Sequence, residues 1–163
     1  MKLHRKEYQQ LLPISLDEAW KFFSAPENLN EITPPEMKFE ILTKDIPRMY
    51  AGQIVQYYVT PFPLIKMGWV TEITQVVDKK MFIDEQRFGP YSFWHHQHMF
   101  EEKDGGVLMT DVLHYRVPLG IVGKLVNALF ISSKVKSIFD YRFKLLENKF
   151  GDAGLTKQKK NNG

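Results

Sequence analysis

Residues 93–115 read FWHHQHMFEEKDGGVLMTDVLHY, and this stretch decides how the middle of the chain folds. Two runs rich in aromatic and β-branched residues flank Asp104-Gly105, a dipeptide typical of a tight hairpin turn. The stretch is therefore predicted to form two antiparallel strands. Side chains of a strand alternate between its two faces. One face of the first strand is accordingly expected to carry Trp94, His96, His98 and Phe100.

The hairpin turn also predicts the register between the two strands. With Lys103 opposite Gly106, each residue of the first strand gains a defined partner on the second. The expected pairs on the Trp94 face are Trp94 with Tyr115, His96 with Leu113, His98 with Asp111 and Phe100 with Met109. A similar register across the preceding turn, Gly89 to Ser92, places Asp84 beside His96, Gln86 beside Trp94 and Phe82 beside His98. The run HHQH is thus divided, because His95 belongs to the opposite face.

The composition predicts one globular domain. The chain has 163 residues, 44% of them hydrophobic and 13% aromatic, which is enough to bury one core. The lack of cysteine excludes disulfides and thiolate metal ligands, and it favours a cytoplasmic location. The N-terminal MKLHRKEYQQ has no apolar run typical of an export signal, and residues 117–135 are too polar for a membrane span. We therefore expect a soluble protein.

The positive charge of the chain is concentrated at its end. The formal net charge is +3, and Lys157, Lys159 and Lys160 of the final TKQKKNNG account for all of it. Residues 152–163 are predicted to be a disordered basic tail, which leaves residues 1–151 as a single domain. A basic face within the fold is not indicated, so no nucleic-acid partner is expected.

The remaining elements follow from turn residues and from hydrophobic spacing. Between residues 37 and 117, six strand-like runs separated by turns predict an antiparallel meander, and LHRKEYQQLLPI predicts a seventh strand. The capping-box spelling SLDE at 15–18 predicts a short helix, and Pro26 predicts a second one. Apolar spacing after Pro118 predicts a long helix over 121–150 that ends before Gly151. The predicted class is α+β, with a curved sheet of six to seven strands wrapped around this helix.

Three motifs accompany this order of elements. They are Gly89-Pro90-Tyr91, the W-x-H-x-H-x-F spelling at 94–100, and D-x-x-x-Y-x-x-P-x-G at 111–120. Over roughly residues 1–150, the chain resembles the helix-grip proteins, also called the START-like or SRPBCC superfamily. This superfamily includes steroidogenic-acute-regulatory lipid-transfer domains, the birch-pollen-allergen (Bet v 1-like) type and bacterial polyketide cyclases. Within it, the spelling is similar to that of a subgroup of small bacterial ligand-binding domains.

The resemblance implies a hydrophobic cavity between the sheet and the C-terminal helix. Such a cavity would bind an apolar or amphipathic small molecule, such as a lipid, an isoprenoid or a polyketide-like compound, in a carrier or a sensor. A mostly apolar wall with a few converging polar groups has the character of a small-molecule pocket. The residues predicted to contact the ligand are Trp69, Thr71, Phe82, Asp84, Gln86, Trp94, His96, His98, Phe100, Met109, Asp111, Tyr115, Leu125 and Leu129. No cofactor and no metal are expected.

Three other interpretations of the polar residues stay open. A His98–Asp111 pair across the hairpin could simply hold the sheet together. The same pair, with His96, could act as an acid and base in a cyclase or dehydratase of the polyketide-cyclase kind. A His-x-His pattern with an aspartate also has the ligand types of a zinc or iron site, although the family resemblance does not call for a metal. A protein-interaction or cochaperone module of the same fold is a further alternative, and the sequence predicts neither a monomer nor a dimer.

Overall fold

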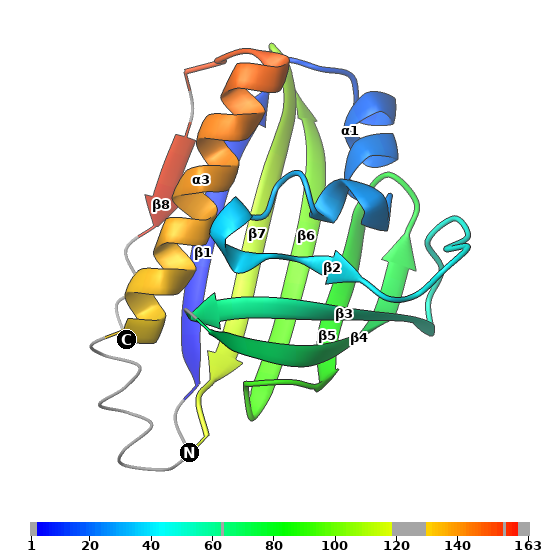
Figure 1. The fold of residues 1–163 in the computed structure, drawn as a ribbon. Helices are drawn as coiled ribbons and strands as arrows, with labels where there is room; N and C mark the ends of the chain where they lie inside the picture. The colour runs from blue at the N-terminus through cyan, green and yellow to red at the C-terminus, as the bar shows by residue number, and fades with distance from the viewer. Residues whose placement is uncertain (1–2, 63, 119–129, 155, 160–163) are drawn as a thin grey trace.

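The computed structural model describes residues 3–62, 64–118, 130–154 and 156–159. Figure 1 shows one sheet that curls around the long helix α3, Ser132–Phe150, with the short helix α1, Leu16–Phe23, near the top of the view. The predicted α+β class and the helix-grip architecture are confirmed. Within the described ranges, no helix is long and apolar enough to cross a membrane.

The six-strand meander lies where the sequence predicts it. Each strand pairs antiparallel with the next, because the connections between them are too short for a crossover. Its strands are β2 Glu40–Ile41, β3 Gln53–Phe62, β4 Ile65–Val77, β5 Met81–Phe88, β6 Phe93–Lys103 and β7 Gly106–Arg116. The predicted register of β6 with β7 is confirmed throughout, including His98 opposite Asp111. Phe82 opposite His98 and Asp84 opposite His96 are confirmed as well.

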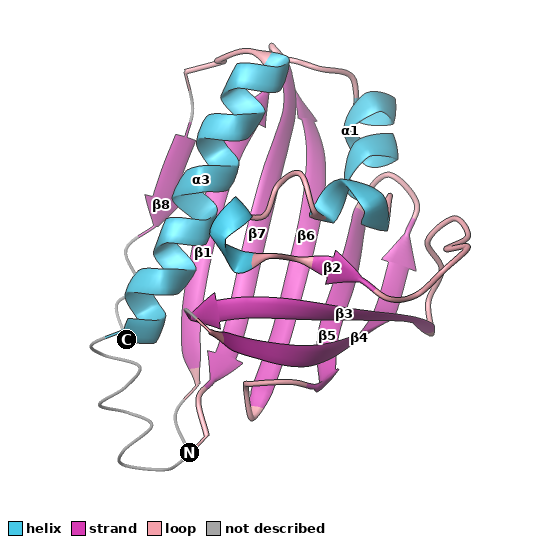
Figure 2. Ribbon diagram, in the orientation of Figure 1, coloured by secondary structure: helices cyan, strands magenta, loops and turns pink. Residues whose placement is uncertain are grey.

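The sheet bends strongly at β3 and β4. Figure 2 shows these two strands running nearly crosswise to β1, β6 and β7. The register shifts between Val59 and Phe62 on β3, and at two places where β4 meets β5. Extra residues of this kind bend a strand and increase its twist. The bend turns one face of the sheet into a concave wall opposite α3.

The first strand and the end of the chain extend the sheet beyond the meander. β1, His4–Leu12, pairs with β7 on one side and with β8, Thr156–Lys159, on the other. The predicted disordered tail is therefore wrong for residues 156–159. Because β1 would otherwise present unpaired backbone N–H and C=O groups at the sheet edge, even the polar run TKQK gains hydrogen bonds by pairing there. The sheet has the order β2-β3-β4-β5-β6-β7-β1-β8.

The two short helices differ in type. The N-terminus of α1 is capped as predicted, since the Glu18 N–H donates to Ser15 Oγ at 3.2 Å. The second predicted helix is a 3₁₀ helix, η1, Pro26–Leu29, and Pro35 starts another, η2, Pro35–Met37. Tight 3₁₀ turns of this length are common as connectors. The segment carries Leu29, Ile32 and Met37 across the open side of the curved sheet.

Helix α3 closes the concave face of the sheet. Its buried residues recur at helical spacing and are Val135, Phe139, Arg142, Phe143 and Leu146. The Phe139 ring stacks on the ring of Tyr8 from β1, with ring centroids 3.9 Å apart. Residues 121–129 of the predicted helix, and with them Leu125 and Leu129, lie outside the described residues. Gly151 ends the helix as predicted, with φ of +103°.

Candidate functional site

A cavity of about 190 Å³ lies between the concave face of the sheet and α3. Its wall is formed by β3, β4, β5 and β6, by the segment around η1 and η2, and by one face of α3. This volume is far above the roughly 10–15 Å³ that holds one water molecule. The side chains along the concave face therefore do not fill the interior completely.

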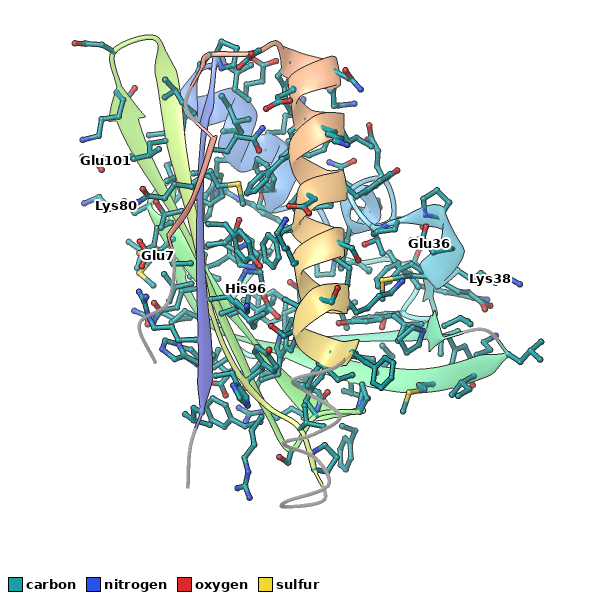
Figure 3. The ribbon with its side chains drawn as sticks, turned by 90° about the vertical axis from the view of Figure 1, so that its left-hand side faces the viewer. Glu7, Glu36, Lys38, Lys80, His96 and Glu101 are labelled. Carbon is teal, nitrogen blue, oxygen red and sulfur yellow. The ribbon has the colours of Figure 1, made fainter. Side chains whose placement is uncertain are left out.

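The W-x-H-x-H-x-F face of β6 points toward this interior. His96, His98 and Phe100 are buried, with His96 only 4% exposed, whereas His95 on the opposite face contacts Glu85 near the surface. Figure 3 shows His96 between the sheet and α3, while Glu101 and Lys80 point away on the other side of the sheet. The predicted orientation of the strand is confirmed, and His95 is separated from the other two histidines.

Two histidines and two aspartates form one connected network. His96 Nε2 lies 2.9 Å from Asp111 Oδ1, and His98 Nε2 lies 2.8 Å from Asp84 Oδ2. Two further contacts close a ring: His96 Nδ1 lies 3.4 Å from Asp84 Oδ2, and His98 Nδ1 lies 2.9 Å from Asp111 Oδ1. The last contact is an ion-pair distance without hydrogen-bond alignment. The predicted His98–Asp111 pair is thus one side of a four-membered arrangement.

Surrounding rings hold the network in place. Phe82 stacks on the His98 ring at 4.2 Å between centroids, and the two imidazoles lie 3.9 Å apart. The indole N–H of Trp94 donates to Asp84 Oδ1 at 3.2 Å. These contacts fix the orientation of rings and carboxylates, because each group meets a partner on more than one side.

The network shifts the pKa values of its two histidines in opposite directions. Burial by itself favours neutral imidazoles, but the contacts of His98 with Asp111 and Asp84 outweigh burial and raise its pKa above the usual value. Burial and the neighbouring His98 together lower the pKa of His96. Burial disfavours a charged Asp111, yet the two imidazoles hold the pKa of that carboxyl well below its usual range. The pKa of Asp84 is likewise lowered against burial, chiefly by His98.

A buried arginine lies beside this network. Arg142 Nη1 of α3 lies 3.6 Å from Asp111 Oδ1, and the side chain is 8% exposed. An arginine stays protonated in proteins, so Arg142 places a positive charge beside the Asp111 carboxylate.

Metal-ligand chemistry is also present in this network. One ligand atom each from Asp84, His96 and His98 lies within 4.8 Å of the others. Imidazole and carboxylate suit zinc or iron. However, each of these groups already contacts partners within the protein. These contacts hold the four side chains in place without a metal, and the expectation that no metal is bound stays a prediction.

Aromatic residues form most of the remaining wall. Trp69 contacts Trp94 edge-on with centroids 5.1 Å apart, and it also contacts Tyr57 and Tyr91. Thr71 satisfies two polar atoms of this cluster, because its Oγ1 lies 2.8 Å from the Tyr57 hydroxyl and accepts from Trp69 Nε1 at 3.0 Å. Burial raises the pKa of Tyr57 far above its usual value, so the hydroxyl keeps its proton. This wall offers flat apolar surfaces with few free polar atoms.

Some of the residues predicted to contact a ligand line the cavity, and others lie elsewhere in the structure. Those that line the cavity are Trp69, Thr71, Phe82, Asp84, Trp94, His96 and His98. Asp111 lies behind the imidazoles, and Phe100 and Met109 pack with α1 in the core. Tyr115 is buried with Tyr8 and Phe139. Gln86 instead fixes the turn before β6, since its amide donates to the Tyr91 carbonyl and accepts from the Tyr91 N–H.

Several cavity residues were missed by the sequence prediction. They include Val55, Tyr57, Val59, Tyr91, Lys134, Ile138 and Arg142. The alternation of side chains along β3 could have identified Val55, Tyr57 and Val59, because these three residues share one face of the strand. The three α3 residues are spaced four apart, which places them on one side of a helix.

Comparisons with known proteins agree with this architecture. No protein-family model and no curated protein matches the chain. An aromatase/cyclase from a Streptomyces species is similar in structure, with a TM-score of 0.71 and 12% identity over 91% of this chain and 93% of that one. A Thermus thermophilus protein has a TM-score of 0.68 and 16% identity, over 91% of this chain and 97% of that one. A major latex-like protein from Panax ginseng has a TM-score of 0.65 and 12% identity, also over 91% of this chain and 97% of that one. At these identities the likeness shows a shared fold.

Proposed function

We propose that the protein binds an apolar or amphipathic small molecule in the cavity between the sheet and α3, as a carrier or sensor. The observation that carries this proposal is the chemistry of the wall. Aromatic and aliphatic side chains cover most of the wall, and the hydrogen-bonded side chains of Asp84, Trp94 and His98 form one polar region of it. A ligand would gain free energy from the apolar wall and orientation from the polar end.

The test is to fill the cavity from β3 without touching the polar network. Val55 points inward and is 4% exposed, while its neighbour Ile54 points outward and is 42% exposed. We expect Val55→Phe to weaken binding of the neutral fluorescent probe N-phenylnaphthylamine by at least about 10-fold, because the added ring occupies the ligand's space. Titration of the probe fluorescence measures the affinity.

Ile54→Phe is the matched control, since it adds the same ring to the outer face of the same strand. It should leave probe affinity unchanged. Val59→Phe provides a second inward substitution in case Val55→Phe unfolds, which circular dichroism would reveal. Equal binding by the folded inward variants and the outward variant would show that the probe does not occupy the cavity, and the proposal would fail.

An acid-base function is the second candidate, and the lowered pKa of His96 favours it. His96 lines the cavity and is neutral near pH 7, so it is the imidazole that can accept a proton, whereas the raised pKa of His98 makes that residue a poor base. The aromatase/cyclase name of one structural neighbour is consistent with such chemistry. In this role, we expect His96→Gln to slow cyclisation of a polyketide-like substrate by about 100-fold or more.

His95→Gln serves as the control for this second candidate, because His95 lies on the outer face of the same strand. Turnover measured by liquid chromatography should be unchanged in this variant. If His96→Gln and His95→Gln retain equal turnover, His96 has no catalytic part.

A further inference from the structure

Arg142 is a buried cation in the wall of the cavity. It lies on α3 one turn after Phe139, its residue is 6% exposed, and its guanidinium carbon lies 5.0 Å from the centroid of the Phe139 ring. Lys134, Ile138 and Arg142 follow one another at intervals of four residues and all line the cavity. One stripe of the helix therefore faces the interior, with positive side chains at both ends and an apolar residue between them.

Two of the three guanidinium nitrogens of Arg142 lack hydrogen-bond acceptors within the described part of the protein. Nε and Nη1 are both buried, and neither donates a hydrogen bond. Asp111 Oδ1 lies 3.6 Å from Nη1, which is too long for a hydrogen bond, and this oxygen already contacts both imidazoles. Unmade hydrogen bonds of a buried charged group are costly, so an acceptor supplied by a ligand would be favourable here.

Other polar side chains of the wall already have partners. Asn28 donates to the Phe22 carbonyl, and Thr33 donates to the Leu29 carbonyl. The Tyr57, Thr71 and Trp69 group is satisfied internally, as is the pair of Trp94 with Asp84. Lys134 has Glu36 at 3.7 Å near the surface. Among these groups, Arg142 combines burial, charge and unused donors.

We propose that the ligand of this cavity is an apolar carboxylic acid whose carboxylate accepts hydrogen bonds from Arg142. This inference rests on the proposed binding function and adds the chemical class of the ligand. A planar carboxylate fits the guanidinium fork, and hydrogen bonds to a charged partner are about twice as strong as neutral ones. Asp84 does not repel such a ligand strongly, because His98 and Trp94 already engage both of its oxygens. Lys134 adds a second positive charge along the same stripe.

The experiment compares ligands that differ only at the polar end. Decanoate and decanol form one pair, and naphthoate and naphthylmethanol form an aromatic pair. Each compound displaces N-phenylnaphthylamine from the full chain at neutral pH. We expect the acid of at least one pair to bind at least about 10-fold more tightly than its alcohol, since a charged hydrogen bond contributes more than a neutral one.

Two variants assign this preference to Arg142. Arg142→Met should lower the affinity for the acid at least about 10-fold and leave the affinity for the alcohol within about 3-fold of the original. Arg142→Lys keeps the positive charge opposite Asp111 but loses the planar fork, so it should fold and show a reduced preference for the acid. Lys134 lies nearer the surface, so Lys134→Gln should lower the affinity for the acid less than Arg142→Met does.

The outcomes separate this inference from the function on which it rests. If the probe binds but acid and alcohol compete equally, or if the preference survives in both Arg142 variants, the carboxylate inference is wrong and the binding function stands. The same conclusion follows if the probe binds and none of the four compounds displaces it. If neither the probe nor any of the four compounds binds, the binding function itself fails.

Discussion

Asp111→Asn is expected to lower the free energy of unfolding by about 3 kcal/mol near pH 6. Asp111 is buried, and it accepts from His96, contacts His98 and lies opposite the charge of Arg142. Asparagine keeps the shape of the side chain but removes the negative charge, which leaves the buried guanidinium of Arg142 without its nearby carboxylate. Removing one partner of a buried ion pair typically costs about 3 to 5 kcal/mol. Urea denaturation followed by tryptophan fluorescence measures the difference.

The effect of this substitution should depend on pH in a defined direction. The pKa of Asp111 is lowered in the folded protein by His96 and His98 against the opposing effect of burial. Its ordinary value in an unfolded chain is about 3.9. The stabilisation by this carboxylate is therefore complete above about pH 4 to 5 and is lost as the pH falls toward the folded value. The difference between the original protein and Asp111→Asn should shrink between pH 6 and pH 3.5.

Glu101→Gln is the control for charge removal. Glu101 lies on β6 with its side chain 63% exposed, paired with Lys103 at the surface. Such exposed pairs contribute about 0 to 1 kcal/mol, so this variant should unfold almost like the original. If Asp111→Asn costs no more than Glu101→Gln at pH 6, the network is not an important source of stability.

Phe139→Ala is expected to destabilise the protein by about 3 to 5 kcal/mol. Phe139 stacks on Tyr8, lies edge-on to His96 with centroids 5.8 Å apart, and supports the guanidinium of Arg142. Truncating a buried phenylalanine to alanine removes these contacts and leaves a void, which costs about this much in other proteins. Thermal and urea unfolding both measure the loss.

Phe139→Leu separates lost volume from lost ring chemistry. Leucine fills much of the same space, and a volume-conserving exchange usually costs less than about 1.5 kcal/mol. A large loss in both variants would mean that the ring itself, through its contacts with Tyr8 and Arg142, holds α3 on the sheet. Small losses in both would show that this contact does not determine the stability of the helix–sheet packing.

Local patterns explain why the central hairpin could be predicted in detail. The turn at Asp104-Gly105 is two residues long, so it fixes the partner of every residue in β6 and β7. Alternation then assigned the inward face correctly, because one face of these strands is buried and the other is not. The position of Asp111 near His98 followed from these two facts alone.

Long-range features were harder to predict. Arg142 stands among Phe139, Phe143 and Leu146 on the apolar stripe of α3, yet an arginine is usually a surface residue, and its partner Asp111 is distant in sequence. The pairing of His98 with Asp84 required the register of a second, less regular turn. The strand β8 has a polar sequence with no alternation, and only the unpaired edge of β1 explains its formation.

The pairing of β8 with β1 also bears on how this sheet meets other chains. An open strand is a template onto which a second molecule can add, and uncontrolled addition of this kind leads to fibrils. In the described part of the chain, Glu7 to Gln10 of β1 are covered by β8, and the strand at the other end of the sheet, β2, is only two residues long. Only short strands therefore lie at the two edges of the described sheet, which limits the backbone available for intermolecular strand addition.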